Sequence, residues 1–207
     1  MSKLIIEPHY LGSLEYYALL LQYDKVELEV CDVFQKQTFR NRAYFLTSNK
    51  VQPLIVPLRY STGCQTKDVT IDYSQRWVKD HWGAFYSGYG KAPFFEYFAD
   101  DFKAIWDVRF ESLCELNLAF MKLTFKILQS DLLLTSTEKY DKNADVDFRD
   151  IINPKKPFSD RKIYHSNAYQ QLFGDTFVPN LSIIDLIMNE GPNAAHILMS
   201  SYNDEID

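Results

Sequence analysis

Short apolar runs in the first 75 residues predict β-strands. Residues 5–6 form an apolar run that Pro8 ends, and residues 26–30 alternate apolar and polar side chains, as a half-buried strand does. Runs at 44–46 and 54–56 flank the polar residues 48–50 and predict a hairpin, and residues 69–71 predict another short strand. Ser13 can cap a helix over about 14–23, between the first two strands.

From residue 75 onward the apolar spacing becomes helical. Trp77, Trp82 and Phe85 mark one segment, which residues 88–90 interrupt, and Pro93 can start the next helix. The strongest helix is predicted over about 111–129, because apolar residues recur there every three or four positions. The stripe consists of Leu113, Leu116, Phe120, Leu123 and Ile127. Residues 132–134 predict a strand behind this helix.

The last third of the chain is less regular. Residues 137–162 are polar, contain two prolines and predict a long surface loop. Ser182 and Asp185 predict a capping box at the start of a helix that Gly191 and Pro192 end, and the tail from residue 203 is expected to fray.

The predicted class is therefore α/β or α+β, with a small mixed sheet from the N-terminal third packed against a mainly helical C-terminal part. We expect a single domain over 1–193, with the end of a C-terminal helix and the tail over 194–207.

The composition favours a globular protein of the cytoplasm. Of the 207 residues, 22 are Lys or Arg and 28 are Asp or Glu, a net charge of −6, which disfavours nucleic-acid binding because that needs a broad basic face. No apolar stretch has the length of an export signal or a transmembrane helix. The three widely spaced cysteines predict free thiols, and the four scattered histidines give no metal-ligand spacing.

Common catalytic motifs do not explain the sequence. Gly90-Lys91 invites comparison with a phosphate-binding loop, but Phe85 stands where that loop needs glycine and Ala92 where it needs Ser or Thr. There is also no His-Glu-x-x-His and no Gly-x-Ser-x-Gly. Candidate chemistry must therefore come from less specific clusters.

His9 is the first such candidate. It follows a predicted strand and precedes a predicted helix, a position where α/β proteins place site residues. Its unperturbed pKa of about 6.5 would let it move a proton near neutral pH. The alternative is a histidine that only hydrogen-bonds within a turn.

A cluster of cations is the second candidate. Lys36, Thr38, Arg40 and Arg42 all occupy even-numbered positions, so in an extended strand their side chains would project to one side. The three cations could then hold a phosphate or carboxylate. Asp32 precedes them as a counter-ion or a base. The alternative is a solvated, charged edge strand.

Both candidates lie in stretches through which the sequence resembles the WbqC-like protein family. The matching stretches are residues 8–11, 32–36 running into 40–42, 54–57, Trp77 with His81, 89–95, 169–173, 180–186 and 189–192. The chain lacks a glycine-containing stretch of the longer members, where it has the polar segment 137–162, and it is similar to the short form of Bacteroides-type bacteria. The resemblance implies a part in surface-polysaccharide (O-antigen-type) assembly, by a transfer reaction on a sugar or sugar nucleotide.

Three functions remain open at this point. The first is a cytoplasmic transferase for an anionic small molecule, such as a sugar nucleotide or an activated acyl or aminoacyl donor, and the others are a non-catalytic anion-binding protein and an interaction factor in envelope biogenesis. The candidate catalytic residues are His9, Asp32 and His81. The candidate binding residues are Tyr10, Lys36, Arg40, Asn41, Arg42, Tyr89 and Lys91. No metal is expected, and the sequence indicates neither a cofactor nor an oligomeric state.

Overall fold

The computed structural model describes residues 4–142 and 146–203. One side of the molecule contains a four-stranded sheet in the order β7-β2-β1-β8, and every neighbouring pair of strands is parallel. The strands are β1 (Leu4–Ile6), β2 (Lys25–Leu28), β7 (Leu133–Ser136) and β8 (Val146–Asp147). All four therefore end at the same edge of the sheet.

Helix α1 (Leu14–Leu20) connects β1 to β2, as the sequence predicts, although it ends three residues earlier than expected. The Ser13 hydroxyl accepts a hydrogen bond from the Tyr16 amide at 3.4 Å and so caps the helix. Every residue of α1 is buried, because the helix lies between the sheet and the C-terminal helices.

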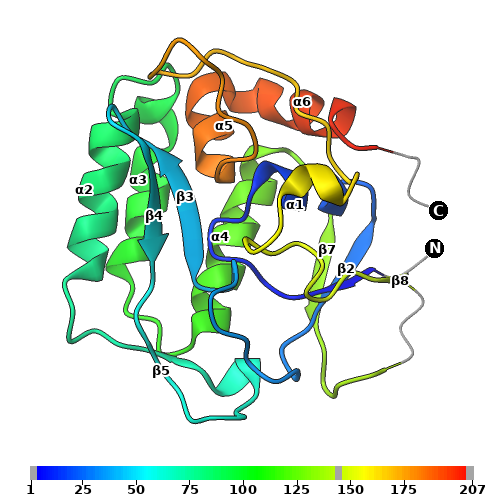
Figure 1. Ribbon diagram of the computed structural model, residues 1–207. Coiled ribbons are helices and arrows are strands. Elements are labelled where there is room, and N and C mark those ends of the chain that lie inside the picture. The colour runs from blue at the N-terminus through cyan, green and yellow to red at the C-terminus, as the bar shows by residue number, and fades with distance from the viewer. Residues whose placement is uncertain (1–3, 143–145, 204–207) are drawn as a thin grey trace.

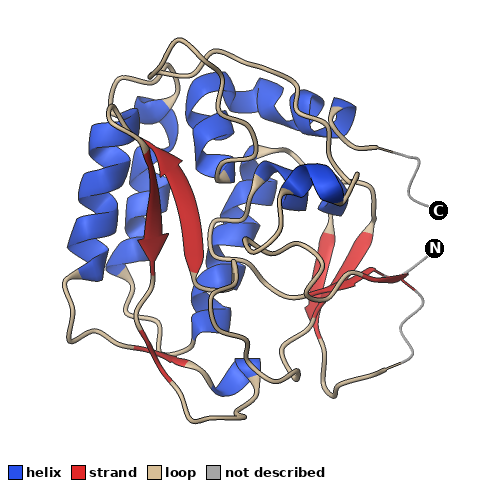
Figure 2. Ribbon diagram, viewed as in Figure 1, coloured by secondary structure: helices blue, strands red, loops and turns tan. Residues whose placement is uncertain are grey.

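Two small antiparallel ribbons stand apart from the parallel sheet (Figure 2). The predicted hairpin is β3 (Arg42–Leu46) with β4 (Val51–Ile55), and a second ribbon joins β5 (Leu58–Arg59) to β6 (Thr70–Ile71). The short 3₁₀ helix η1 (Thr66–Asp68) precedes β6.

The helices pack against these ribbons and against α1 (Figure 1). They are α2 (Trp77–Tyr89), α3 (Phe95–Asp107), α4 (Leu113–Ile127), α5 (Ile183–Glu190) and α6 (Ala194–Ser200), with 3₁₀ turns η2 (Phe158–Asp160) and η3 (Gly191–Asn193). All five stripe residues of α4 are buried, which confirms its predicted phase. Helix α4 begins with a complete capping box of Ser112 and Glu115, and no described helix is long and apolar enough to span a membrane.

The predicted mixed α/β class is confirmed, but the sheet differs from the expectation in two ways. It is parallel throughout, and β7 and β8 come from after residue 130 rather than from the N-terminal third. The segment 137–162, predicted as a long surface loop, also contains the two-residue strand β8, and Ile152 within it is fully buried. The predicted frayed tail lies, apart from Asn203, outside the described residues.

Candidate functional site

Polar side chains follow each strand at the carboxyl edge of the parallel sheet. In open parallel sheets this edge is where ligands bind, most often where the chain connections diverge to opposite sides. Here β1 leads to β2 on one side while β8 pairs with its other side. The polar residues just beyond the strands are Glu7 and His9, Glu29 and Asp32, Thr137, and Arg149 and Asp150.

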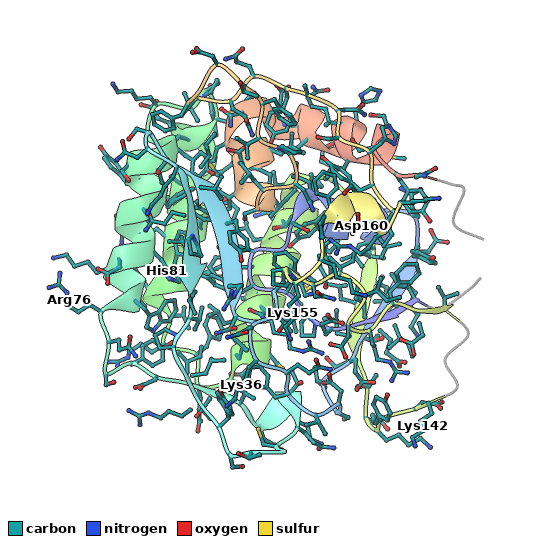
Figure 3. The ribbon with its side chains drawn as sticks, in the orientation of Figure 1. Lys36, Arg76, His81, Lys142, Lys155 and Asp160 are labelled. Atoms are coloured by element: carbon teal, nitrogen blue, oxygen red, sulfur yellow. The ribbon has the colours of Figure 1, made fainter. Side chains whose placement is uncertain are left out.

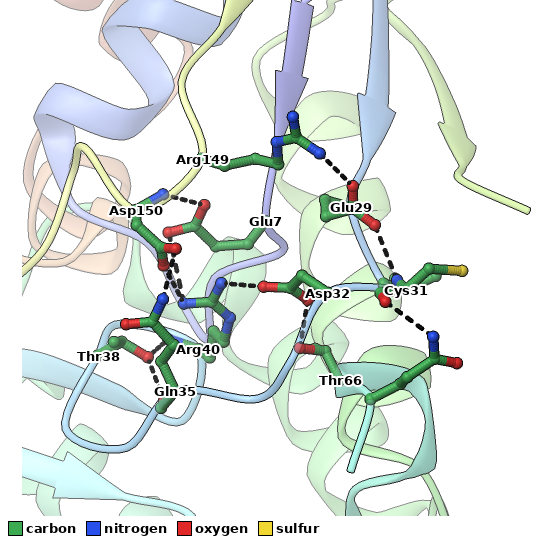
Figure 4. A network of polar contacts seen from close by, with 12 residues as sticks. Glu7, Glu29, Cys31, Asp32, Gln35, Thr38, Arg40, Thr66, Arg149 and Asp150 are labelled. Atoms are coloured by element: carbon green, nitrogen blue, oxygen red, sulfur yellow. Dashed lines mark hydrogen bonds and ion pairs between the residues drawn. The ribbon is translucent and has the colours of Figure 1, made fainter. Parts of the chain in front are cut away.

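Arg40 lies at the centre of this edge with its side chain fully buried (Figure 4). Its Nη2 donates to Asp32 Oδ2 at 2.6 Å, and its Nη1 donates to Asp150 Oδ1 at 2.9 Å. The same Nη1 lies 3.7 Å from Glu7 Oε1. The Asp150 amide donates to Glu7 Oε2 at 3.0 Å, which closes the cluster. One guanidinium therefore balances three carboxylates that arrive from β1, β2 and β8.

A second arginine joins the end of β8 to the end of β2. Arg149 Nη1 donates to Glu29 Oε2 at 2.8 Å, and its Nε donates to Asp147 Oδ1 at 2.9 Å. The guanidinium also lies 4.4 Å from the centre of the Tyr140 ring. Glu29 Oε1 accepts from the Thr137 hydroxyl at 2.8 Å, so these contacts tie the ends of β2, β7 and β8 together.

The cluster perturbs the pKa values of its members. Burial alone would raise the pKa of Glu7, but the hydrogen bond with His9 and the charge of Arg40 bring it down to about 2. For Asp32, burial raises the pKa above its usual range, against the opposing effect of Arg40 and of the Thr66 hydroxyl, which donates to Oδ1 at 2.5 Å. Burial lowers the pKa of His9. Asp32 is therefore a stronger base than an ordinary aspartate.

A crevice of about 440 Å³ opens beside this cluster. Asp32, Asp150 and Arg149 line it together with Cys31, Val33, Gln35 and Tyr140. Around it, the five carboxylates of Glu7, Glu29, Asp32, Asp147 and Asp150 face the two guanidinium groups of Arg40 and Arg149. The surroundings of the crevice thus carry an excess of negative charge, which favours a cationic or amine-bearing ligand.

Comparison with known proteins identifies the family of this chain. The model of the WbqC-like protein family matches residues 7–154 and 155–197, which include every member of the cluster. The chain belongs to the WbqC-like family. No curated protein and no solved structure matches it.

The structure of this WbqC-like chain groups part of the predicted site. His9 Nε2 lies 3.2 Å from Glu7 Oε1, and Glu7 in turn contacts Arg40, which pairs with Asp32. His9 is fully buried and stacks on Tyr16 with the ring centres 4.1 Å apart. It does not line the crevice.

The predicted common face of Lys36, Arg40 and Arg42 is wrong. The segment turns instead of extending, and Gln37 adopts a left-handed φ of 59°. Arg40 points inward to the carboxylates, whereas Lys36 is exposed, with its Nζ 5.3 Å from the centre of the Tyr60 ring. Arg42 is the first residue of β3. Because its guanidinium is engaged by carboxylates, Arg40 has little capacity left for an anion.

Tyr10 and His81 form a separate buried chain of hydrogen bonds. The Trp106 indole donates to the Tyr10 hydroxyl at 2.9 Å, and that hydroxyl lies 2.8 Å from His81 Nδ1. Burial lowers the pKa of His81 to about 4, so the ring is neutral at physiological pH. Neither side chain lines the sheet-edge crevice.

The remaining predicted binding residues lie elsewhere. The Tyr89 hydroxyl accepts from the Leu46 amide at 3.2 Å, and Asn41 Nδ2 donates to the Val56 carbonyl at 2.9 Å, both of which fix the β3–β4 hairpin. Lys91 is exposed and lines a different hollow of about 670 Å³, beside Phe173. The structure does not bring these three to the sheet edge.

The predicted capping box of α5 is only half formed. The Ser182 hydroxyl accepts from the Ile184 amide at 3.4 Å, but the Asp185 carboxylate does not return to the helix start. Its Oδ2 accepts from the Tyr169 hydroxyl at 2.5 Å and from Gln171 Nε2 at 2.9 Å. Asp185 therefore anchors the 169–171 segment, and burial raises its pKa.

Sequence reasoning missed Glu7, Glu29, Arg149 and Asp150. The signal for Glu7 was available, since it directly follows the apolar run that forms β1, whereas Glu29 fell inside the strand predicted over 26–30 and β2 ends at Leu28. Arg149 and Asp150 carried no such signal, because β8 has only two residues within a polar segment. Among the described residues, no group of three or more His, Cys, Asp or Glu is arranged to hold a metal ion.

Proposed function

We propose that this WbqC-like chain is a cytoplasmic transferase that modifies a sugar or sugar nucleotide in the biosynthesis of bacterial surface polysaccharide. The observation that carries the proposal is Asp32, a buried carboxylate that lines a crevice at the carboxyl edge of the parallel sheet. The pathway is inferred from the family resemblance, and the location of the chemistry is inferred from this crevice.

Asp32 is proposed as the general base. Arg40 and Thr66 each donate to one of its oxygens and so fix its orientation, and burial raises its pKa toward the working pH. An acceptor ammonium first gives up one proton to water. The neutral amine, or a hydroxyl, then passes a proton to Asp32 while its nitrogen or oxygen bonds to the transferred group. The bond between that group and its carrier then breaks, and the carrier leaves with the electron pair.

The charge around the crevice supports an amine-bearing acceptor, such as an amino sugar. Asp32 and Asp150 both line the crevice, and the cation beside them, Arg149, is engaged by Glu29 and Asp147. An ammonium group would be attracted to these carboxylates, whereas a phosphate would be repelled. This charge pattern weighs against the anion-binding alternative at the sheet edge.

A ligand screen followed by a matched pair of variants tests the proposal. Amino sugars and sugar nucleotides are first screened by thermal shift, because a bound ligand raises the melting temperature. In Asp32→Asn, turnover of the identified pair should fall by about 10²–10⁴-fold with the acceptor affinity nearly retained. Asp131→Asn makes the same change at an exposed site and should leave turnover intact. Full turnover in Asp32→Asn would refute Asp32 as the base.

A further inference from the structure

A second pocket, with the opposite charge, lies between α2 and α3 on the side of the molecule away from the parallel sheet (Figure 1). Its volume is about 460 Å³, within the range of roughly 300–1,000 Å³ typical of small-molecule sites. Its lining consists of Tyr73, Gln75, Arg76, Val78, Lys79, Trp82, Lys103, Trp106, Asp107 and Arg109. None of these residues belongs to the sheet-edge cluster.

Cations dominate this lining. Arg76, Lys79, Lys103 and Arg109 face a single carboxylate, that of Asp107, in a chain whose net charge is −6. Lys103 Nζ pairs with Asp107 at 2.5 Å, which neutralises both of these groups. In the part of the chain that the structure describes, Arg76 and Lys79 form no ion pair. Figure 3 shows the Arg76 side chain extending from the start of α2.

Aromatic rings supply the rest of the pocket. The ring centres of Trp82 and Trp106 lie 6.2 Å apart, and the two ring planes meet at 68°. The Arg109 guanidinium lies over the Tyr73 ring, 4.7 Å from the ring centre. The Trp106 indole is 1% exposed and is held by its hydrogen bond to Tyr10. Trp106 is therefore a rigid support with no open face, and the indole that a planar ligand can reach is the partly exposed Trp82, whose ring centre lies 5.6 Å from Lys103 Nζ.

We propose that this pocket binds a nucleoside diphosphate, with the base against the Trp82 indole and the diphosphate on Arg76, Lys79 and Arg109. Within the described residues Arg109, like Arg76 and Lys79, forms no ion pair, and three such cations match the charge of a diphosphate. The Trp82 indole matches a base, because every base offers a flat face for stacking. The site stands independently of the transferase proposed above, since the two share no residue.

Calorimetric titration of the full chain at low salt tests the site with three probes, namely ADP, pyrophosphate and adenosine. ADP should bind with a dissociation constant below about 1 mM. Pyrophosphate and adenosine should each bind about tenfold or more weakly than ADP, because each lacks one half of the ligand. ADP should also quench the tryptophan fluorescence, since two of the three tryptophans line the pocket. Weaker ADP binding than this limit, or equal binding of pyrophosphate, would overturn the proposal.

Three variants separate the pocket from general charge effects. Lys79→Ala and Arg76→Ala remove exposed cations and should each lower ADP affinity about tenfold without affecting folding. Lys122→Ala removes an exposed cation from α4, outside the pocket, and should bind ADP as the wild type does. Wild-type affinity in both pocket variants, or an equal loss in Lys122→Ala, would show that ADP does not bind in this pocket.

Discussion

The guanidinium of Arg40 and the carboxylate of Asp32 meet at 2.6 Å although the Arg40 side chain is fully buried. An isolated charge in such a place would cost several kcal/mol, and the site is stable only because charges of both signs are present together. The pair thus has two consequences. It joins the loop after β2 to the start of β3, and it holds a carboxylate at the crevice in one orientation.

Arg40→Met should therefore destabilise the fold strongly. The methionine fills part of the volume, but it leaves Glu7, Asp32 and Asp150 close together without their shared cation. The expected loss is about 3–5 kcal/mol in the free energy of unfolding, measured by urea denaturation.

Arg59→Met is the matched control for this substitution. Arg59 pairs with Asp72 at 2.8 Å, but 66% of its side chain is exposed, so the loss should be about 0–1 kcal/mol. Equal losses in the two variants would mean that burial adds nothing to the Arg40 cluster.

Local sequence patterns correctly predicted the elements that contacts between neighbouring residues determine. The α4 stripe, the β3–β4 hairpin and the Ser13 cap follow from spacing and turn chemistry, and all three are present. Strand β8 could not be found in this way. Its two residues are held by parallel pairing with β1, more than 130 positions away, and that pairing leaves no periodicity in the segment itself.

The candidate site was predictable only in part, for a similar reason. His9 stood out because it follows a predicted strand, and Asp32 because it precedes the cluster of cations. The structure connects the two through Arg40 and Glu7. The direction of the Arg40 side chain depends on the left-handed backbone at Gln37 and on the distant Asp150. The alternation of side chains along an extended strand predicts neither the turn at Gln37 nor the contact with Asp150.

His81 should make the stability of the fold depend on pH. The Tyr10 hydroxyl receives the Trp106 N–H, so its own proton points to His81 Nδ1, which cannot then be protonated without losing that bond. Its pKa of about 4 in the fold lies below the unfolded value of about 6.5. Between these values the unfolded chain binds more protons, so stability falls as the pH is lowered through this window, by roughly 3 kcal/mol.

His81→Gln should remove this part of the pH dependence. Urea denaturation at several pH values between about 4 and 7 should give a flatter curve for the variant than for the wild type. His9 keeps its own contribution, of the same sign, in both proteins. His196→Gln changes an exposed histidine and should follow the wild-type curve. Parallel curves for His81→Gln and the wild type would argue against a neutral, buried His81.

Leu116→Ala tests the packing of α4. Leu116 is fully buried in the middle of the apolar stripe, so truncation removes apolar contacts and leaves a cavity. The expected loss is about 2–5 kcal/mol in chemical denaturation. Leu118, on the same helix, is only partly buried, and Leu118→Ala should cost less. The reverse order would place the stripe on the wrong face of the helix.

Variants at the start of α5 test whether Ser182 and Asp185 act as one capping pair or through two independent contacts. Ser182→Ala should cost about 0.5–2 kcal/mol, because the hydroxyl accepts from the Ile184 amide and donates to the Leu11 carbonyl at 2.8 Å. Asp185→Asn should destabilise through a different contact, the one with Tyr169 and Gln171. The double variant should therefore lose the sum of the two single losses, within about 0.5 kcal/mol.

Ser112 and Glu115 provide the comparison, because they form a complete capping box at the start of α4. The Glu115 carboxylate accepts from the Ser112 amide at 3.4 Å, and the Ser112 hydroxyl accepts from the Glu115 amide and, at 3.1 Å, from the Cys114 amide, so the box holds both side chains in place. The double variant of Ser112→Ala and Glu115→Ala should then lose less than the sum of the two single losses, as residues in one hydrogen-bonded unit do. If Ser182 with Asp185 showed the same coupling, Asp185 would have to return to the helix start in solution. The contact with Tyr169 would then not be its main role.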